Sequence, residues 1–151
     1  MTISARRADA TRLDERLCLA LSMASRAMTA RYRPLLSPLG LTYPQYLVML
    51  LLWQEGGCSV GGIGEHLRLE SSTLSPLLKR LESVGLITRA RDTHDERSVI
   101  VDLTMKGRSL ERRTRGVTAA ICEATGLDAQ QQAEFVANLR SLATQLQSPS
   151  T

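Results

Sequence analysis

The segment 59–103 reads SVGGIGEHLRLESSTLSPLLKRLESVGLITRARDTHDERSVIVDL and contains two helical patterns followed by a strand pattern. Ser59 predicts the N-cap of a short helix. Three apolar residues of this helix recur at helical spacing and share one face, namely Val60, Ile63 and Leu67. Residues 68–70 then predict a tight turn. The segment therefore opens with a short helix and a sharp change of direction.

A second helix follows that turn. Ser71 and Ser72 can cap its start, and Gly85 predicts its end. Pro76 falls close to the first turn, where a missing N–H costs least. The leucines at positions i, i+3, i+4 and i+7 form an apolar face, namely Leu74, Leu77, Leu78 and Leu81. The two helices and their turn predict a helix–turn–helix.

Beyond Gly85 the apolar period falls to two. Residues 86–89 and 99–103 alternate like strands and enclose the polar segment 92–97. This pattern predicts a β-hairpin with a charged tip. A short helix, a tight turn, a serine-capped helix and such a hairpin are the outline of a winged helix–turn–helix.

The flanks on both sides are helical. Helical spacing predicts a helix over 12–36, and Thr42 with Gln45 predicts a capped helix running through Trp53. Helical spacing returns over 104–124 and again from an Asp128 cap to about residue 147. We therefore expect a mainly α fold with a small β-hairpin wing, in a single domain over 1–151.

Composition excludes several classes of protein. With 151 residues, 43% of them hydrophobic, the chain can bury a core without disulfides or a structural metal. Its three cysteines are widely spaced and lack both CxxC pairing and nearby histidines, so we expect no metal site and no cofactor. The N-terminus lacks a signal-peptide pattern, and the longest apolar run, 47–53, is too short to span a bilayer. We expect a cytoplasmic protein without a membrane role.

Basic residues are concentrated in blocks. Residues 1–34 carry seven arginines against three acidic residues, and residues 106–116 carry five basic residues against one. The net charge of the whole chain is +4. Blocks of positive charge permit an anionic partner such as a nucleic acid without proving one.

The second helix of the helix–turn–helix has the composition of a DNA-reading helix. Hydroxyl side chains occupy the end that would reach base edges, and two cations follow that could contact phosphates. These residues are Ser71, Ser72, Thr73, Ser75, Lys79 and Arg80. The alternative is that the serines merely cap a surface helix and the cations are merely solvated. The hairpin that follows favours DNA binding.

Arg97 lies in the predicted hairpin tip, with Asp95 close by. An arginine on a projecting tip can enter a narrow A·T-rich minor groove, and a neighbouring carboxylate can hold its guanidinium in place. The alternative is a surface salt bridge worth under about 1 kcal/mol.

The segment 95–107 resembles the signature of MarR-type winged-helix repressors. Asp95-Glu-Arg-Ser98 and Val101-Asp-Leu-Thr-Met-Lys-Gly107 are similar to the D-x-R-[AS] and L-T-x-x-G motifs of that family. The resemblance extends over essentially the whole chain. It implies a homodimer on a pseudo-palindromic site in double-stranded DNA, with the residues listed above on the recognition helix in the major groove and Asp95 and Arg97 on the wing.

The same resemblance divides the chain by role. It implies dimerisation helices over 12–36 and 104–147, and a DNA-binding core over 43–103.

The segment 41–50, LTYPQYLVML, resembles the organic-hydroperoxide-sensing OhrR branch of this family. In that branch, a cysteine in the first helix is followed by tyrosines 14 and 25 residues later; here these are Cys18, Tyr32 and Tyr43. The resemblance implies a repressor that organic hydroperoxides inactivate by oxidising Cys18, with the tyrosines supplied by the partner subunit. The chemistry agrees, because a thiol reacts with peroxides as the thiolate, and two phenolic O–H donors can stabilise that anion. A buried, unreactive cysteine is the alternative.

Cys122 resembles the resolving cysteine of two-cysteine members, which forms a disulfide with the reactive cysteine of the other subunit. A small thiol could instead complete the oxidation of Cys18. Many relatives carry aromatic residues where this chain has Leu19 and Ser22, so the preferred peroxide is left open. No pattern supports a role for Cys58.

Two other functions are compatible with the sequence. A MarR-type regulator could be released from DNA by a non-covalent small aromatic ligand, with Cys18 uninvolved. A thiol peroxidase could use Cys18 as its nucleophile, but the only histidines, His66 and His94, are isolated in the sequence. We therefore do not expect an enzyme.

Overall fold

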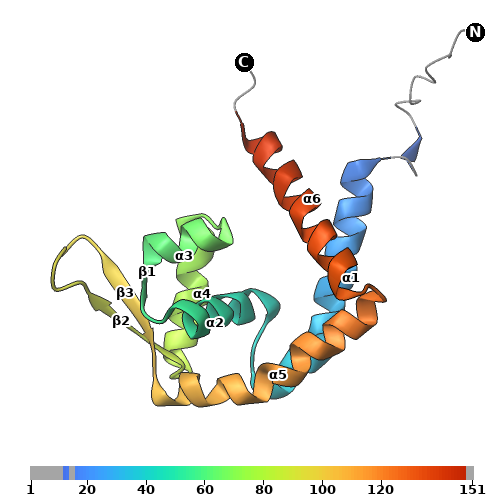
Figure 1. Ribbon diagram of the computed structural model, residues 1–151. Coiled ribbons are helices and arrows are strands. Elements are labelled where there is room, and N and C mark those ends of the chain that lie inside the picture. The colour runs from blue at the N-terminus through green and yellow to red at the C-terminus, as the bar shows by residue number, and fades with distance from the viewer. Residues whose placement is uncertain (1–11, 14–15, 149–151) are drawn as a thin grey trace, which may run out of the picture.

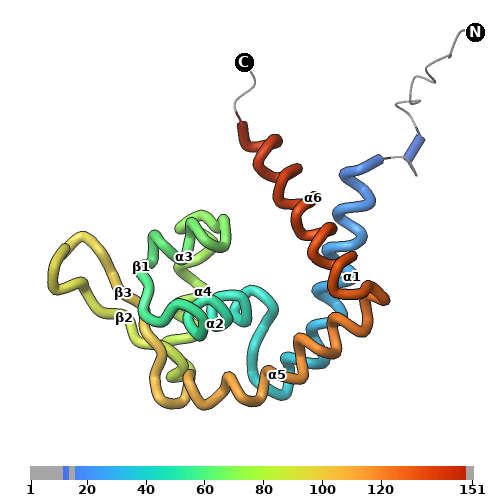
Figure 2. Tube along the Cα trace, viewed as in Figure 1, coloured from blue at the N-terminus to red at the C-terminus, as the bar shows by residue number. Residues whose placement is uncertain are grey.

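A computed structural model describes residues 12–13 and 16–148. The chain forms a compact head, and a helical arm made of its first and last helices lies to one side of that head (Figures 1 and 2). Helix α1 (Leu17–Leu36) leads into the head, the long helix α5 (Met105–Thr125) leads out of it, and α6 (Ala129–Gln147) completes the arm. The predicted domain limits, 1 and 151, lie outside the described residues.

The head contains the helix–turn–helix and a small sheet. Its elements are η2 (Ser37–Leu39), α2 (Tyr43–Glu55), β1 (Cys58–Ser59), α3 (Val60–Leu67), α4 (Ser71–Ser83), β2 (Ile87–Arg91) and β3 (Val99–Leu103). The antiparallel strands are ordered β1-β3-β2, with Ile87 opposite Leu103 and Arg91 opposite Val99. The predicted mainly α fold with a winged helix–turn–helix is confirmed.

The sheet has one strand more than predicted. Cys58 pairs with Val101 and Ser59 pairs with Ile100, so β1 forms a third strand along β3. A strand of two residues shows no periodicity, and its partner lies some forty residues further along the chain. The sequence pattern could therefore predict the hairpin but not β1.

Helix starts that depend on short-range capping follow the sequence. Thr42 and Gln45 form a capping box at α2, and Asp128 and Gln131 form one at α6. Ser59 accepts the N–H of Gly62 at 3.0 Å at the start of α3, as predicted.

Two helix starts differ from the prediction. Helix α1 begins at Leu17 instead of near residue 12, because the backbone of Arg16 is extended and makes no helical turn. Helix α4 is preceded by Glu70 at the N-cap position and has no side-chain cap, so Ser71 and Ser72 lie inside the helix with exposed side chains. The hydroxyl groups predicted to cap α4 are thereby left available to a partner.

Pro76 also lies deeper in α4 than predicted. It is the sixth residue of the helix and not part of the first turn. Its missing N–H deprives the carbonyl of Ser72 of its usual helical donor. That carbonyl belongs to an exposed residue, so water can satisfy it.

The hydrophobic core lies in the head. Tyr46, Met49 and Leu52 of α2 are buried against Ile63 of α3 and against the leucine face of α4. Val101 of β3 and Leu110 of α5 close the same core. The core fixes α4 and the hairpin on a rigid base, from which their polar faces project.

Gly107 explains the L-T-x-x-G part of the sequence pattern. A Cβ at this position would overlap the carbonyl oxygen of Leu86, so only glycine allows α5 to approach the head this closely. Thr104 donates a hydrogen bond to the carbonyl of Gly85 at 2.6 Å, and the indole N–H of Trp53 donates to the carbonyl of Gly107 at 3.0 Å. The motif therefore joins the wing, the head and the start of α5.

Replacing Gly107 with alanine should destabilise the head. Because the added methyl group meets backbone and not a mobile side chain, we expect the free energy of unfolding to fall by about 3 kcal/mol, the upper part of the usual overpacking cost. Urea unfolding followed by circular dichroism would measure this.

Gly116→Ala is the matched control on the same helix. Nothing lies within 4 Å of a Cβ at Gly116, and alanine is the better helix former, so this change should be neutral or stabilise by up to about 1 kcal/mol. Equal costs for the two substitutions would contradict the close approach at Gly107.

The arm leaves apolar side chains exposed within one chain. Helix α6 buries none of its residues, and α1 buries only Leu36. Large exposed apolar residues lie along both helices, namely Leu17, Met23 and Met28 on α1 and Phe135, Val136, Leu139 and Leu146 on α6. Exposed apolar side chains repeated along two helices in this way are typical of an interaction face.

Over residues 12–13 and 16–148, no single helix is long and apolar enough to cross a membrane. Residues 17–39 and 43–55 together have the length and apolar composition of a membrane span, but the two segments are bent by 70° relative to each other.

Candidate DNA-binding face and thiol–phenol site

Helix α4 turns one face to the core and the opposite face to solvent. Leu74, Leu78 and Leu81 are buried. The residues predicted to contact DNA are all exposed, namely Ser71, Ser72, Thr73, Ser75, Lys79 and Arg80. The structure therefore gathers the predicted hydroxyl groups and cations on one accessible helix surface, with the hydroxyl groups at its N-terminal end.

The hairpin tip holds Arg97 away from the head. Its side chain is 94% exposed, and its Nε lies 3.7 Å from Oδ1 of Asp95. The same carboxylate oxygen accepts the backbone N–H of Arg97 at 3.1 Å. Asp95 therefore shapes the turn as well as facing the guanidinium, and a contact at full exposure adds little stability of its own.

A salt bridge that the sequence did not indicate ties the wing to α4. Arg89 of β2 lies 3.0 Å from Glu82 through its guanidinium, and its backbone N–H also donates to the carboxylate at 3.1 Å. The hydrogen bond from the Arg89 side chain lowers the pKa of Glu82. Recognition helix and wing are thereby linked directly, and Arg89 is engaged within the protein.

Three tyrosines form a cluster where α1 meets α2. The ring centroids of Tyr32 and Tyr43 are 4.7 Å apart, and those of Tyr32 and Tyr46 are 5.8 Å apart. Tyr46 was not predicted to belong here. Its position three residues after Tyr43 on the same helix was the available signal.

The surroundings of these phenols keep them protonated. Burial raises the pKa of Tyr32 to about 12, and Tyr43, Tyr46 and Cys122 act in the same direction. Burial, with Tyr46 adding to it, also raises the pKa of Tyr43. A phenol with its ordinary pKa of about 10 is already an O–H donor at neutral pH, and these shifts extend that state to higher pH. The hydroxyl of Tyr46 is 3.4 Å from that of Thr118, so it has a partner within the chain.

Cys122 lies beside this cluster. It is half-buried on the last turns of α5 and adds, as the smallest of the causes, to the raised pKa of Tyr32. Its thiol donates to the side-chain carbonyl of Gln132 at 3.5 Å. The fold thus brings Tyr43 and Cys122 each close to Tyr32 in one chain.

Cys18 lies at the other end of α1, on the second residue of the helix, and its side chain is exposed. Fourteen residues separate it from Tyr32, which corresponds to about 21 Å along a helix. One chain therefore does not bring Cys18 to the tyrosines. Cys122 lies near Tyr32 and is therefore also far from Cys18 of the same chain. A disulfide between two cysteines needs their Cα atoms within about 7 Å.

Cys58 has a different environment. It is half-buried in β1, and burial together with Glu55 raises the pKa of its thiol. Such a thiol is a poor nucleophile at neutral pH. Within the described residues, no three His, Cys, Asp or Glu side chains are arranged to hold a metal ion.

Comparison with known proteins gives the family. Residues 30–113, more than half of the chain, match the family described as transcriptional regulator SarA/Rot. The organic hydroperoxide resistance transcriptional regulator of Bacillus subtilis is 47% identical over 113 residues, covering 75% of this chain and 77% of that protein. The chain belongs to the SarA/Rot and MarR-type family of winged-helix transcriptional regulators.

Other MarR-type proteins agree in sequence and in structure. The regulator TtmR of Methylorubrum extorquens is 45% identical over 140 residues, covering 93% of this chain and 72% of that protein. Reduced AbfR of Staphylococcus epidermidis, solved bound to DNA, is 35% identical with a TM-score of 0.72, over 86% of this chain and 90% of that one. This MarR-type chain is accordingly a DNA-binding transcriptional regulator and not an enzyme.

A second solved MarR-type structure contains a bound ligand. PcaV of Streptomyces coelicolor, in complex with its natural ligand, is 28% identical with a TM-score of 0.80, over 89% of this chain and 96% of that one. MarR-type proteins have therefore been solved both with DNA and with a ligand bound.

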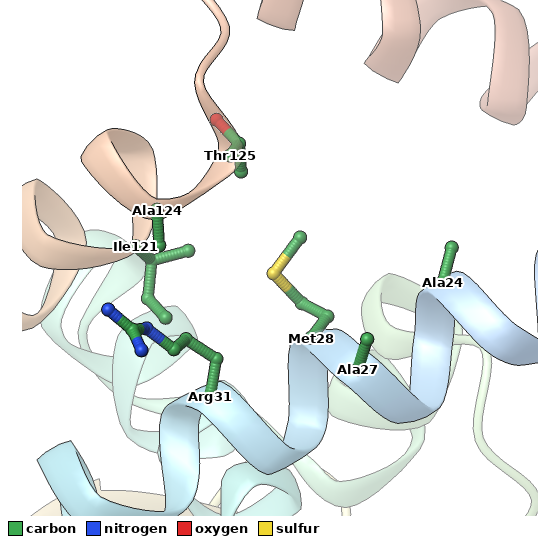
Figure 3. A pocket seen from close by; sticks show the side chains of 7 residues that line it. All are labelled: Ala24, Ala27, Met28, Arg31, Ile121, Ala124 and Thr125. Atoms are coloured by element: carbon green, nitrogen blue, oxygen red, sulfur yellow. The ribbon is translucent and has the colours of Figure 1, made fainter.

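A cavity of about 400 Å³ lies between α1 and the end of α5 in this regulator (Figure 3). Small and apolar side chains make up most of its lining, including Ala24, Ala27, Met28 and Ile121. Arg31 also lines the cavity and is followed in the sequence by Tyr32, and the lining residue Ile121 is followed by Cys122. The cavity is open on one side and lies along α1 between Cys18 and the tyrosines.

Proposed function

We propose that this regulator is a dimeric repressor that organic hydroperoxides release from DNA by oxidising Cys18. The observation that carries the proposal is the distance between the cysteine and the tyrosines within one chain. Cys18 is exposed at the N-terminal end of α1, and the protonated phenols of Tyr32 and Tyr43 lie near its C-terminal end. A second subunit with α1 reversed would bring each Cys18 to its partner's phenols. The name of the Bacillus subtilis relative supports the choice of signal.

Dimerisation through α1, α5 and α6 is part of this proposal. The exposed apolar residues of α1 and α6 supply a surface that one chain leaves uncovered. The open cavity between α1 and the end of α5, which Arg31 lines, offers a recess for the N-terminal end of the partner's α1. The dimer would thereby cover apolar surface and complete two sensing sites in one step.

The chemistry at each site needs a thiolate and a peroxide. Two phenolic donors from the partner stabilise the thiolate of Cys18 in an apolar surrounding. The sulfur attacks the terminal peroxide oxygen, the O–O bond breaks, and the alkoxide takes a proton to leave as an alcohol. Cys18 becomes a sulfenic acid, and the thiol of the partner's Cys122 displaces water from it to form a disulfide. Leu19 and Ser22 leave more open space beside the sulfur than aromatic residues would.

Oxidation then has to reach the DNA-binding face. In the proposed operator complex, the hydroxyl end of α4 reads base edges in the major groove, Lys79 and Arg80 contact phosphates, and Arg97 enters the minor groove. Helix α5 carries Cys122 at one end and is fixed to the head through Gly107 at the other. A disulfide that moves α5 would therefore tilt the head and spoil the spacing of the two reading helices.

The test is DNA binding with and without an organic hydroperoxide. Fluorescence anisotropy with duplexes from the region upstream of the regulator's own gene should reveal a tight site in the reduced state. We expect cumene hydroperoxide to weaken that binding by about 5–150-fold, the range of a 1–3 kcal/mol coupling, and dithiothreitol to restore it. Unchanged binding after stoichiometric oxidation of Cys18 would contradict the proposal.

A non-covalent aromatic ligand is the second candidate. It is favoured by a cavity of about 440 Å³ that places Arg33 and Thr29 beside Tyr43, a setting suited to an aromatic acid. Release of DNA by such an acid from a Cys18→Ser variant would support this function. Release that depends strictly on Cys18 and hydroperoxide would exclude it as the main signal.

A further inference from the structure

The basic block at the start of α5 takes no part in the surfaces described so far. It comprises Lys106, Arg108, Arg112, Arg113 and Arg115, with Glu111 as its one acidic residue. Arg108 lies 3.6 Å from Asp102 of β3, so its charge is partly matched. Lys106 and Arg113 form no ion pair among the described residues.

These two cations line a cavity of about 350 Å³ shared by three parts of the head. Arg80 of the C-terminal half of α4 lines this cavity together with Lys106 and Arg113 of α5. Gly40, in the loop before α2, completes this part of the wall. Ser109 contributes a hydroxyl group, and leucine and valine side chains form the remainder of the wall. No carboxylate lines this cavity, which we call the Arg80–Lys106–Arg113 pocket.

Main-chain carbonyl groups orient two of the cations. The ammonium group of Lys106 donates to the carbonyl of Val84 at 2.8 Å. The guanidinium of Arg113 donates to the carbonyl of Pro38 at 3.3 Å. Each group has further N–H donors that these contacts do not use. Three like charges around one recess repel one another, and an anion between them would relieve that repulsion.

The position of the pocket indicates which anion it meets. Arg80 follows Ser71 by nine residues, about 13 Å along α4. The major groove is about 12 Å wide and is bordered by phosphate strands, so with α4 lying across the groove and its start over base edges, a cation this far along the helix reaches the level of a phosphate strand. We infer that the Arg80–Lys106–Arg113 pocket binds one backbone phosphate of the DNA, an inference that rests on the proposed placement of α4 in the major groove.

The inference predicts a change in salt dependence. Affinities of the full-length dimer for its operator and for an unrelated duplex are measured between 50 and 200 mM KCl. For Arg113→Gln we expect the slope of log affinity against log salt to fall by about 1, equally for both duplexes, because a phosphate contact carries no sequence information. Arg113→Lys keeps the charge and should restore most of the slope.

Arg115→Gln is the matched control, because it removes the same charge from the same helix outside the pocket. Its slope should stay close to that of the unmodified protein. An unchanged slope in Arg113→Gln, or an equal change in Arg115→Gln, would overturn the inference. Thermal unfolding of each variant verifies that the fold is retained.

Free phosphate is the other source of the same chemistry. In the DNA-free dimer, amide NMR signals of Gly40 and Ser109 are followed as inorganic phosphate is added. Saturable shifts that vanish in Arg113→Gln, combined with an unchanged DNA salt slope, would assign the pocket to free phosphate and overturn the DNA assignment. Release of DNA by hydroperoxide is recorded on the same samples, so failure of the redox proposal would be seen separately.

Discussion

Cys18→Ser should bind the operator as tightly as the unmodified protein and lose all response to organic hydroperoxides. Serine keeps the size and exposure of the side chain but has no sulfur to oxidise, so the reduced structure has no reason to change. In the unmodified protein we expect a loss of affinity of about 5–150-fold on oxidation, and in the variant none. Anisotropy titrations before and after cumene hydroperoxide measure both.

Cys58→Ser provides the matched control for that experiment. Burial and Glu55 raise the pKa of Cys58, so its thiol stays protonated and slow to react. This variant should keep the full response. A hydroperoxide response that survives in Cys18→Ser, or that is lost in Cys58→Ser, would assign the sensing thiol elsewhere.

Removing the phenolic hydroxyl groups should slow the oxidation of Cys18 without weakening DNA binding. A hydrogen bond to a charged acceptor is worth about 1.5–3 kcal/mol, which corresponds to about a 10–150-fold loss of rate if the thiolate loses one donor. We therefore expect losses of this size for Tyr32→Phe and for Tyr43→Phe, and a larger loss for the double variant. Rates are measured by trapping the sulfenic acid with dimedone and counting adducts by mass spectrometry.

Tyr46→Phe tests whether the loss is specific. It makes the same chemical change in the same aromatic cluster, but the hydroxyl of Tyr46 is directed to Thr118. Its oxidation rate should remain within a few-fold of the unmodified protein. If Tyr32→Phe and Tyr43→Phe oxidise no more slowly than Tyr46→Phe, their hydroxyl groups do not specifically stabilise the thiolate.

The parts of the fold that depend on neighbouring residues were predictable from the sequence. Capping boxes such as Thr42 with Gln45 act over three residues, and the leucine spacing of α4 reflects a single buried face. The start of α1 and the cap of α4 were not predictable, since several residues near each start could serve equally well. Strand β1 was missed because its partner, β3, is distant in the sequence.

The candidate sites divide in the same way. Side chains on one exposed helix face, such as Ser72, Ser75 and Lys79, follow from helical periodicity alone. The link between Arg89 and Glu82 and the entry of Tyr46 into the aromatic cluster depend on how elements pack. In the proposed dimer, the relation of Cys18 to the tyrosines depends further on a second subunit, and no single chain can show it.

Sensing between subunits is the central claim, and a mixed dimer tests it most directly. One subunit carries Cys18→Ser, and the other carries Tyr32→Phe with Tyr43→Phe. Distinct affinity tags allow the heterodimer to be purified away from both homodimers. If each site combines Cys18 of one subunit with the tyrosines of the other, this heterodimer contains one intact site and one inactive site.

The rate of Cys18 sulfenylation in this heterodimer, measured with limiting cumene hydroperoxide, gives the answer. We predict that its single Cys18 reacts at the rate of the unmodified protein, although it sits on the chain without the two phenolic hydroxyl groups. A rate as slow as that of the double phenylalanine homodimer would contradict the account, because the phenols would then act on the cysteine of their own chain or not at all.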